Sequence, residues 1–164
     1  VERRLQRLED IEAIRNLKER YATLCDQNFD PDGIAELYTE DCVFESNGLG
    51  NHYGREAIRT LMQTVTSEIL WAHHFMIAPR IEVADDGRAA TGTWFLLDLL
   101  TMTGLEEGAP PDAVLVTANY TDQYVKIDGE WKFKHVVADI KMITNLDQGW
   151  VRQPRRGEFK VSEA

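Results

Sequence analysis

The most unusual chemical group in this sequence is a carboxylic acid placed among large apolar side chains. The segment from Arg88 to Met102 is rich in aromatic and branched residues, which predicts a long β-strand. Because successive side chains of a strand alternate between its two faces, Asp98 shares a face with Trp94 and Leu96. Burial in a pocket would raise the pKa of this acid until it could donate a proton. The alternative is a strand buried on its other face, which leaves Asp98 exposed to water.

Histidine is the second candidate for proton transfer, because imidazole titrates near neutral pH. The chain has four histidines without HxxxH or HxH spacing, so the sequence predicts no metal site. His73 and His74 lie on opposite faces of the β-structure predicted from Trp71 to Val83, and alternation does not choose which one faces inward. We interpret His52 and His135 as bystanders.

A helix is predicted from about Glu9 to Asp26, because apolar residues recur there at steps of three and four. Tyr21 lies on the apolar stripe and therefore points inward, whether it is catalytic or simply packed. Asp26 falls opposite that stripe, so an ideal helix would direct it to solvent. Only a loosened last turn, or a helix covered on both sides, would bring Asp26 inward.

The elements that would position these groups form two blocks. A short second helix ending near residues 39–41, a strand at residues 42–45 and a third helix from Arg55 to about Ile69 follow the first helix. The remainder is predicted as long strands at residues 71–83, 88–102, 114–127 and 131–143, with Asp-Gly turns before the second and the fourth. Helices followed by a meander of long strands predict an α+β domain. Strands of this length must coil, so a cone that encloses a pocket is expected.

Composition limits the possible functions. At 164 residues the chain has the size of one domain, and its net charge of −10 argues against nucleic-acid or anionic-membrane surfaces. No apolar run approaches the length needed to cross a bilayer, and the first residues show no signal-peptide pattern, which predicts a cytoplasmic protein. Cys25 and Cys42 are expected to be reduced and buried, with a disulfide as the less favoured alternative.

Four stretches of the chain carry a family resemblance. They are residues 11–21 with Asp26, residues 37–44, residues 92–98 and residues 120–133. Over roughly residues 8–145 the sequence resembles the SnoaL-like branch of the nuclear-transport-factor-2-like superfamily. The resemblance implies a cone-shaped α+β barrel, with three N-terminal helices packed on a strongly curved, mixed and mostly antiparallel sheet. We expect this domain to occupy residues 1–147. The segment 148–164 has no clean periodicity and is predicted to be a C-terminal tail or an arm that contacts a partner.

Within this superfamily the sequence is most similar to bile-acid 7α-dehydratases and lindane dehydrochlorinases, with scytalone dehydratases more distant. These groups catalyse eliminations with no metal and no organic cofactor. Their motifs match Tyr21 and Asp26 at the end of the first helix, His74 ahead of a Pro-x-Ile strand, and Asp98 at the close of Trp-Phe-Leu-Leu-Asp. The resemblance implies that His74 is the base and Asp26 orients it, while Tyr21 and Asp98 serve the leaving group or a substrate carbonyl. The dehydrochlorinase pattern shares only the aspartate and the histidine.

The leading hypothesis is a cofactor-independent lyase that removes water or another β-leaving group from a hydrophobic cyclic or steroid-like molecule. The residues predicted to bind the substrate are Phe44, Trp71, Phe75, Trp94, Leu96 and Tyr120. Relatives self-associate, which implies a homo-trimer or homo-dimer. A ketosteroid-isomerase-like or cyclase-like enzyme, which would rely on an acidic residue, is one alternative. A non-catalytic ligand-binding domain, or one like the β subunit of ring-hydroxylating dioxygenases, is another.

Overall fold

A single six-stranded sheet forms the body of the molecule in the computed structural model, which describes residues 1–157 and 159. The strands are β1 (Tyr38–Ser46), β2 (Gly50–Tyr53), β3 (Ile69–Val83), β4 (Ala89–Met102), β5 (Asp112–Ile127) and β6 (Glu130–Asn145). Their order across the sheet is β2-β1-β6-β5-β4-β3. All neighbours pair antiparallel except β1 and β6, which are parallel, so the sheet is mixed and mostly antiparallel as expected. Strands β2 and β3 are its free edges, so the predicted cone is open and does not close into a barrel.

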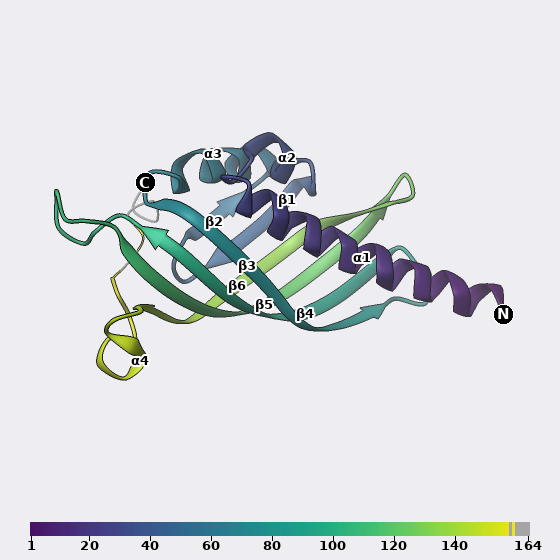
Figure 1. The fold of residues 1–164 in the computed structure, drawn as a ribbon. Coiled ribbons are helices and arrows are strands. Elements are labelled where there is room, and N and C mark those ends of the chain that lie inside the picture. Colours follow the sequence, from purple (N-terminus) through teal and green to yellow (C-terminus); the bar gives the residue numbers. More distant parts are fainter. Residues whose placement is uncertain (158, 160–164) are drawn as a thin grey trace.

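The helices are α1 (Glu2–Asp26), α2 (Pro31–Ala35), α3 (Arg55–Val65) and α4 (Gly149–Arg152). Figure 1 shows α1, α2 and α3 on one side of the sheet, which curves around that side. The predicted α+β class and the predicted arrangement of three N-terminal helices on a curved sheet are confirmed. The core lies between these helices and the inner face of the sheet.

Bulges help to explain the curvature of the long strands. The β3–β4 pairing shifts register between Ile77 and Arg80, where Ala78 adopts a left-handed backbone conformation with φ of 52°. The β5–β6 pairing shifts register twice. A bulge inserts a residue on one strand and increases the local twist of the sheet, so these shifts bend the sheet toward the helices.

Helix α1 begins well before the predicted Glu9. Its first turns have no buried stripe, because Leu5 and Leu8 are 54% and 64% exposed. This end is attached instead by Arg7, whose guanidinium donates to the carbonyl oxygen of Val83 at 2.9 Å. Apolar periodicity cannot detect a helix whose contacts are polar, which explains the difference.

Two other boundaries differ from the prediction. The second helix ends at Ala35, before the predicted residues 39–41, because Tyr38 already pairs with Phe133 as β1 joins β6. Strand β2 was not predicted, since Gly50 and its neighbouring glycines indicated turns, yet Gly50 pairs with Ser46 of β1. The two cysteines are buried and free, as expected.

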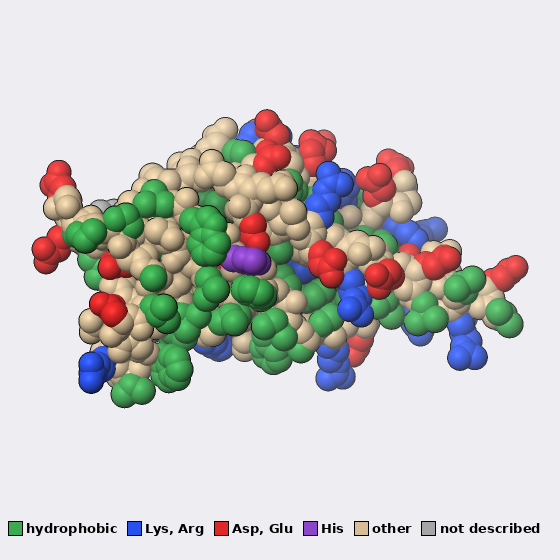
Figure 2. Space-filling view, in the orientation of Figure 1, with side chains coloured by type: hydrophobic (Ala, Val, Ile, Leu, Met, Phe, Trp, Pro, Cys, Tyr) green, Lys and Arg blue, Asp and Glu red, His purple; other side chains and the backbone are tan. Residues whose placement is uncertain are grey.

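The outer face of the sheet carries exposed apolar side chains along β3 and β4. The large ones are Trp71, Phe75, Ile77, Phe95 and Leu99, which are between 39% and 55% exposed. Figure 2 shows apolar side chains gathered across the middle of the view, where β3 runs in Figure 1. A contiguous apolar face of this kind is typical of an interaction surface.

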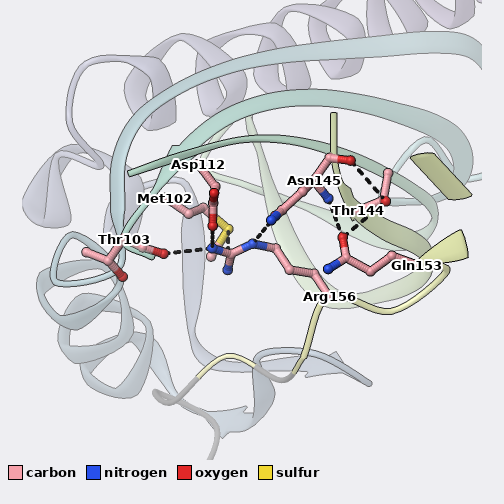
Figure 3. A network of polar contacts seen from close by, with 7 residues as sticks. All are labelled: Met102, Thr103, Asp112, Thr144, Asn145, Gln153 and Arg156. Carbon is pink, nitrogen blue, oxygen red and sulfur yellow. Dashed lines mark hydrogen bonds and ion pairs between the residues drawn. The ribbon is translucent and has the colours of Figure 1, made fainter. Parts of the chain in front are cut away.

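The segment after β6 is packed onto the sheet through Arg156 (Figure 3). This side chain is buried and donates through Nη2 to Oδ2 of Asp112 and to the carbonyl oxygen of Thr103, both at 2.7 Å. Its Nε atom donates to Oδ1 of Asn145 at 2.5 Å, and Gln153 accepts from the Asn145 backbone N–H at 2.6 Å. The predicted tail at residues 148–164 is therefore attached to the domain over its described part, and residues 158 and 160–164 lie outside the described residues.

We predict that Arg156→Met destabilises the protein by about 2–4 kcal/mol, because it leaves three buried or half-buried acceptors without their donor. The measurement is urea unfolding with the slope compared between variants. Arg152→Gln, at an exposed position of α4, is the control and should change the free energy of unfolding by less than about 0.5 kcal/mol. Equal stability of the two variants would contradict a structural role for Arg156.

Candidate active site

Three ionisable side chains meet where the end of α1 contacts β3 and β4. The Nδ1 atom of His74 lies 2.7 Å from Oδ1 of Asp26, and its Nε2 atom lies 3.4 Å from Oδ2 of Asp98. The side chains of His74 and Asp98 are 7% and 8% exposed, whereas that of Asp26 is 26% exposed. The imidazole is therefore held between one carboxyl group near the surface and one in the interior.

Strand pairing explains why His74 and Asp98 meet. They are directly opposite partners in the antiparallel pair β3–β4. Side chains of such partners lie on the same face, with Cβ atoms about 4.5–5.5 Å apart. On β4, Asp98 is buried on the inner face together with Leu96 and Leu100. Of the two alternatives for Asp98, the structure places the acid inside the cone.

Asp26 reaches the site although its position on the helix predicted exposure to solvent. Helix α1 contacts β3 on a second side, and Ala22, one turn before Asp26, is buried as well. β3 is an edge strand, and the backbone N–H of His74 on its free edge donates to Oδ1 of Asp26 at 2.9 Å. The helix ends at Asp26, and Asn28 and Phe29 follow in left-handed conformations. An ideal helix with one buried stripe would direct Asp26 to solvent. Of the two alternatives that would bring it inward, the structure has the helix covered on two sides, which widens its buried face beyond the apolar stripe.

The orientation of the imidazole follows from its partner. A carboxylate only accepts hydrogen bonds, so the contact with Asp26 at 2.7 Å places the ring hydrogen of neutral His74 on Nδ1. The Nε2 atom then carries the lone pair and faces Asp98. His73 points the other way, onto the outer face, where its ring stacks on Phe75 with centroids 4.6 Å apart.

Burial dominates the electrostatics of Asp98. Removal from water raises the pKa of this carboxyl to about 6, an effect that His74 opposes and the nearby Asp26 reinforces. Its Oδ1 atom has no hydrogen-bond partner in the part of the chain that the structure describes. A carboxyl group of this kind retains its proton at mildly acidic pH and can donate it to a bound molecule.

Two tyrosines lie next to this triad. Tyr21 from α1 and Tyr120 from β5 are both buried, and both line the cavity described next. Burial raises the pKa of both hydroxyl groups, so they remain protonated hydrogen-bond donors across the physiological range.

An internal cavity of about 50 Å³ connects these groups. Tyr21, Ser46, His74, Asp98 and Tyr120 line it together with apolar side chains. The apolar lining consists of Phe29, Leu49, Met62, Val65, Ile69, Leu96, Leu100, Val116, Ala118, Ala138, Ile140 and Phe159. The site is thus an apolar chamber with a few polar groups on its wall, as is usual for a small-molecule site.

Four of the residues predicted to bind substrate do not line this cavity. Trp71 and Phe75 are 52% and 40% exposed on the outer face, because they lie an odd number of positions from the inward-facing His74. Trp94 is buried but turned away from the cavity, with its Nε1–H donating to the hydroxyl of Tyr124 at 3.0 Å. Phe44 is buried on β1, beside the ring of His52. Of the predicted set, Leu96 and Tyr120 line the cavity.

Sequence reasoning also missed residues that surround the site. Phe29 and Phe159 reach it from a turn and from the C-terminal segment, where no periodicity predicts direction. Lys18 and Asp122 form a fully buried ion pair at 2.8 Å. The sequence did contain a signal for Asp122. It lies on the same strand face as Tyr120 and Tyr124, just as Asp98 lies on the same face as Leu96 and Leu100.

Residues 6–137, most of the described chain, match the family model of the SnoaL-like domain. The chain belongs to the SnoaL-like family. A type 2 hexachlorocyclohexane dehydrochlorinase is similar over 87% of this SnoaL-like chain and 92% of its own, with a TM-score of 0.77 and 25% identity. The type 3 enzyme from Novosphingobium barchaimii has a TM-score of 0.75, with 25% identity over 87% and 93% of the two chains. A candidate scytalone dehydratase from Novosphingobium aromaticivorans has a TM-score of 0.74, with 24% identity over 85% and 89%, and supports the fold alone.

Among residues 1–157 and 159, no group of three or more histidine, cysteine, aspartate or glutamate side chains has an arrangement that could hold a metal ion. None of the helices in the same residues is long and apolar enough to cross a membrane.

The buried acid predicts a pH-dependent stability. The pKa of Asp98 is raised to about 6 in the folded chain, so the native state keeps a proton that the unfolded chain loses near its ordinary value of 3.8. The protonated acid favours folding below about pH 4, and this contribution of roughly 3 kcal/mol declines as the pH rises through about 6. Asp98→Asn should gain stability relative to wild type by that amount between pH 4 and pH 7, as measured by urea unfolding.

Asp147→Asn, at an exposed position after β6, is the matched control for this measurement. Its difference from wild type should stay constant over the same pH range. A constant difference for Asp98→Asn as well would contradict a raised pKa for this acid.

Proposed function

We propose that this SnoaL-like protein is a cofactor-independent lyase that eliminates water, or another β-leaving group, from a hydrophobic cyclic molecule. The observation that supports this most directly is the imidazole of His74 held between Asp26 and Asp98 at the wall of an apolar cavity. Similarity to a dehydrochlorinase at 25% identity supports an elimination. Cyclic ketones of steroid-like character suit the apolar lining.

The chemistry begins with the lone pair of His74 Nε2, which removes a proton from the carbon next to the substrate carbonyl. Asp26 orients the ring and stabilises the imidazolium that forms. The C–H electron pair becomes the new double bond, and the leaving group departs with its own bonding pair. A leaving hydroxide takes a proton from the carboxyl of Asp98, while the hydroxyl of Tyr21 donates a hydrogen bond to that oxygen or to the substrate carbonyl. The 3.4 Å separation of Nε2 and Asp98 Oδ2 then lets the imidazolium return its proton to the acid.

The size of the cavity requires a change of shape when substrate binds. A volume of about 50 Å³ holds about one or two water molecules, far less than a cyclic ketone needs. Binding of such a substrate therefore requires side chains of the lining to move apart.

We predict that His74→Ala lowers kcat/KM for elimination by about 10²–10⁴-fold, the usual contribution of a general base. The assay follows mass loss and ultraviolet absorbance on a panel of hydroxy-keto steroids and simpler cyclic β-hydroxy ketones. His73→Ala is the matched control, since the neighbouring histidine lies on the outer face, and it should stay within about threefold of wild type. Asp26→Asn should resemble His74→Ala, because the amide no longer stabilises the imidazolium.

An isomerase-type reaction is the second candidate, and the buried, raised-pKa carboxyl of Asp98 favours it. In that mechanism the acid itself carries the proton between two carbons. Asp98→Asn would then abolish turnover while His74→Ala would retain much of it. Saturable binding without turnover of any substrate would instead indicate a ligand-binding domain.

We also propose that the protein forms a homo-oligomer through the outer face of β3 and β4. The apolar patch on that face supports this, because the aromatic rings of Trp71, Phe75 and Phe95 are each at least 40% exposed. Phe75→Glu combined with Phe95→Glu should produce a monomer in sedimentation analysis. A wild-type monomer would contradict the proposal, as would a double variant with unchanged mass.

A further inference from the structure

A second buried polar cluster lies behind the wall of the cavity. The ammonium group of Lys18 is 2.8 Å from Oδ2 of Asp122, and the two side chains are 1% and 0% exposed. The hydroxyl of Tyr124 donates to the same oxygen at 2.8 Å, and Trp94 donates to that hydroxyl at 3.0 Å. Oδ1 of Asp122 has no hydrogen-bond partner among the described residues.

Aromatic rings surround the lysine. Its Nζ atom lies 3.5 Å from the ring centroid of Tyr120, 5.5 Å from that of Tyr21 and 5.4 Å from that of Phe133. A cation within about 6 Å of an aromatic face is attracted by the ring, and the attraction grows when water is excluded. Lys18 therefore contacts the rings of Tyr21 and Tyr120, the two tyrosines that line the cavity.

Stability alone does not account for this pair. Removing two charges from water costs several kcal/mol per ion, and well-packed apolar residues of similar volume are often as stabilising as a buried ion pair. What an ion pair adds is a fixed distance and direction between two elements. In this protein the Lys18–Asp122 ion pair joins α1 to β5 close to the two tyrosines. Lys18 is three residues before Tyr21 on α1, and Asp122 is two residues after Tyr120 on β5.

We propose that Lys18 and Asp122 are positioning residues that hold the hydroxyl groups of Tyr21 and Tyr120 together as one hydrogen-bond donor site for an oxygen of the substrate. This inference rests on the proposed function, because it assigns the oxygen-binding part of the same site. The tyrosine pair supplies donors, whereas the His74 group supplies the base. A substrate oxygen, either the carbonyl or the leaving hydroxyl, then binds to two preorganised donors that need not reorient during the reaction.

The test compares two double variants that each remove an acid–lysine pair, one fully buried and one in which the lysine is 24% exposed. Lys18→Met with Asp122→Asn removes both charges of the positioning pair. Asp10→Asn with Lys126→Met removes the matched control pair, which is joined at 2.7 Å and does not line the cavity. The single variant Lys18→Met is expected to be less stable than its double variant, because it leaves Asp122 buried without a counter-ion.

Three quantities are measured for each protein: stability in urea, kcat and KM on the substrate panel, and the NMR signals of tyrosine labelled with carbon-13 at Cζ. The chain has five tyrosines, and Tyr→Phe variants assign their signals. In the Lys18/Asp122 double variant the signals of Tyr21 and Tyr120 should move, and kcat should fall by about ten- to a hundredfold, as expected when a reacting group is misplaced by about 1 Å. The exposed Tyr53 serves as the internal reference.

The control pair separates positioning from general destabilisation. The Asp10/Lys126 variant should lose stability while kcat stays within about threefold of wild type and the signals of Tyr21 and Tyr120 stay in place. Unchanged kcat and unchanged signals in the Lys18/Asp122 variant would overturn the proposal, and so would an equal loss of kcat in the control. If the wild-type protein turns over no substrate, the lyase proposal fails, and the tyrosine signals alone still decide whether Lys18 and Asp122 position the pair.

Discussion

One carboxylate, that of Asp26, connects the last residue of α1 to the free edge of β3. The same oxygen accepts the backbone N–H of His74 and the ring nitrogen of that residue. The first contact satisfies a donor that an edge strand would otherwise leave open, and the second fixes the tautomer of the imidazole. Because α1 is held at this point, the register of β3 against β4 then decides that Asp98 faces the other ring nitrogen. The position of the helix end on the sheet edge and the orientation of the imidazole thus both depend on Oδ1 of Asp26.

Sequence patterns predicted more of the fold than of the site. The four long strands and the third helix follow from alternation and periodicity, because each depends on residues close together in the chain. Alternation placed Asp98 on one face with Trp94 and Leu96 but left open whether that face is buried. The contact of His74 with Asp98 depends on register, which no local pattern encodes. For Asp26, the helix period indicated a single buried stripe on α1, whereas contact with β3 buries a second side of the helix. The resemblance to elimination enzymes predicted Asp26 where physical pattern did not.

Three buried aspartates differ in their contacts, and these contacts give the same type of side chain different roles. Burial would raise the pKa of Asp10, but hydrogen bonds from Lys126 and Trp131 bring it below its ordinary value. Asp122 is paired with the ammonium group of Lys18. Asp98 faces only an imidazole, and burial raises its pKa to about 6. Two of these acids therefore act as fixed anions that tie elements together, and the third can exchange a proton near neutral pH.

The parallel pairing of β1 with β6 has a consequence for how the chain must fold. β1 is the first strand in sequence and β6 is the last, so nearly a hundred residues separate partners such as Tyr38 and Phe133. Forming that contact requires closure of a long loop, which costs entropy before any packing compensates. During synthesis, β1 can pair with β2 and α1 can contact β3 early, but the pairing of β1 with β6 must wait until the final strand has emerged. The parallel pair is therefore among the last strand pairings that can form.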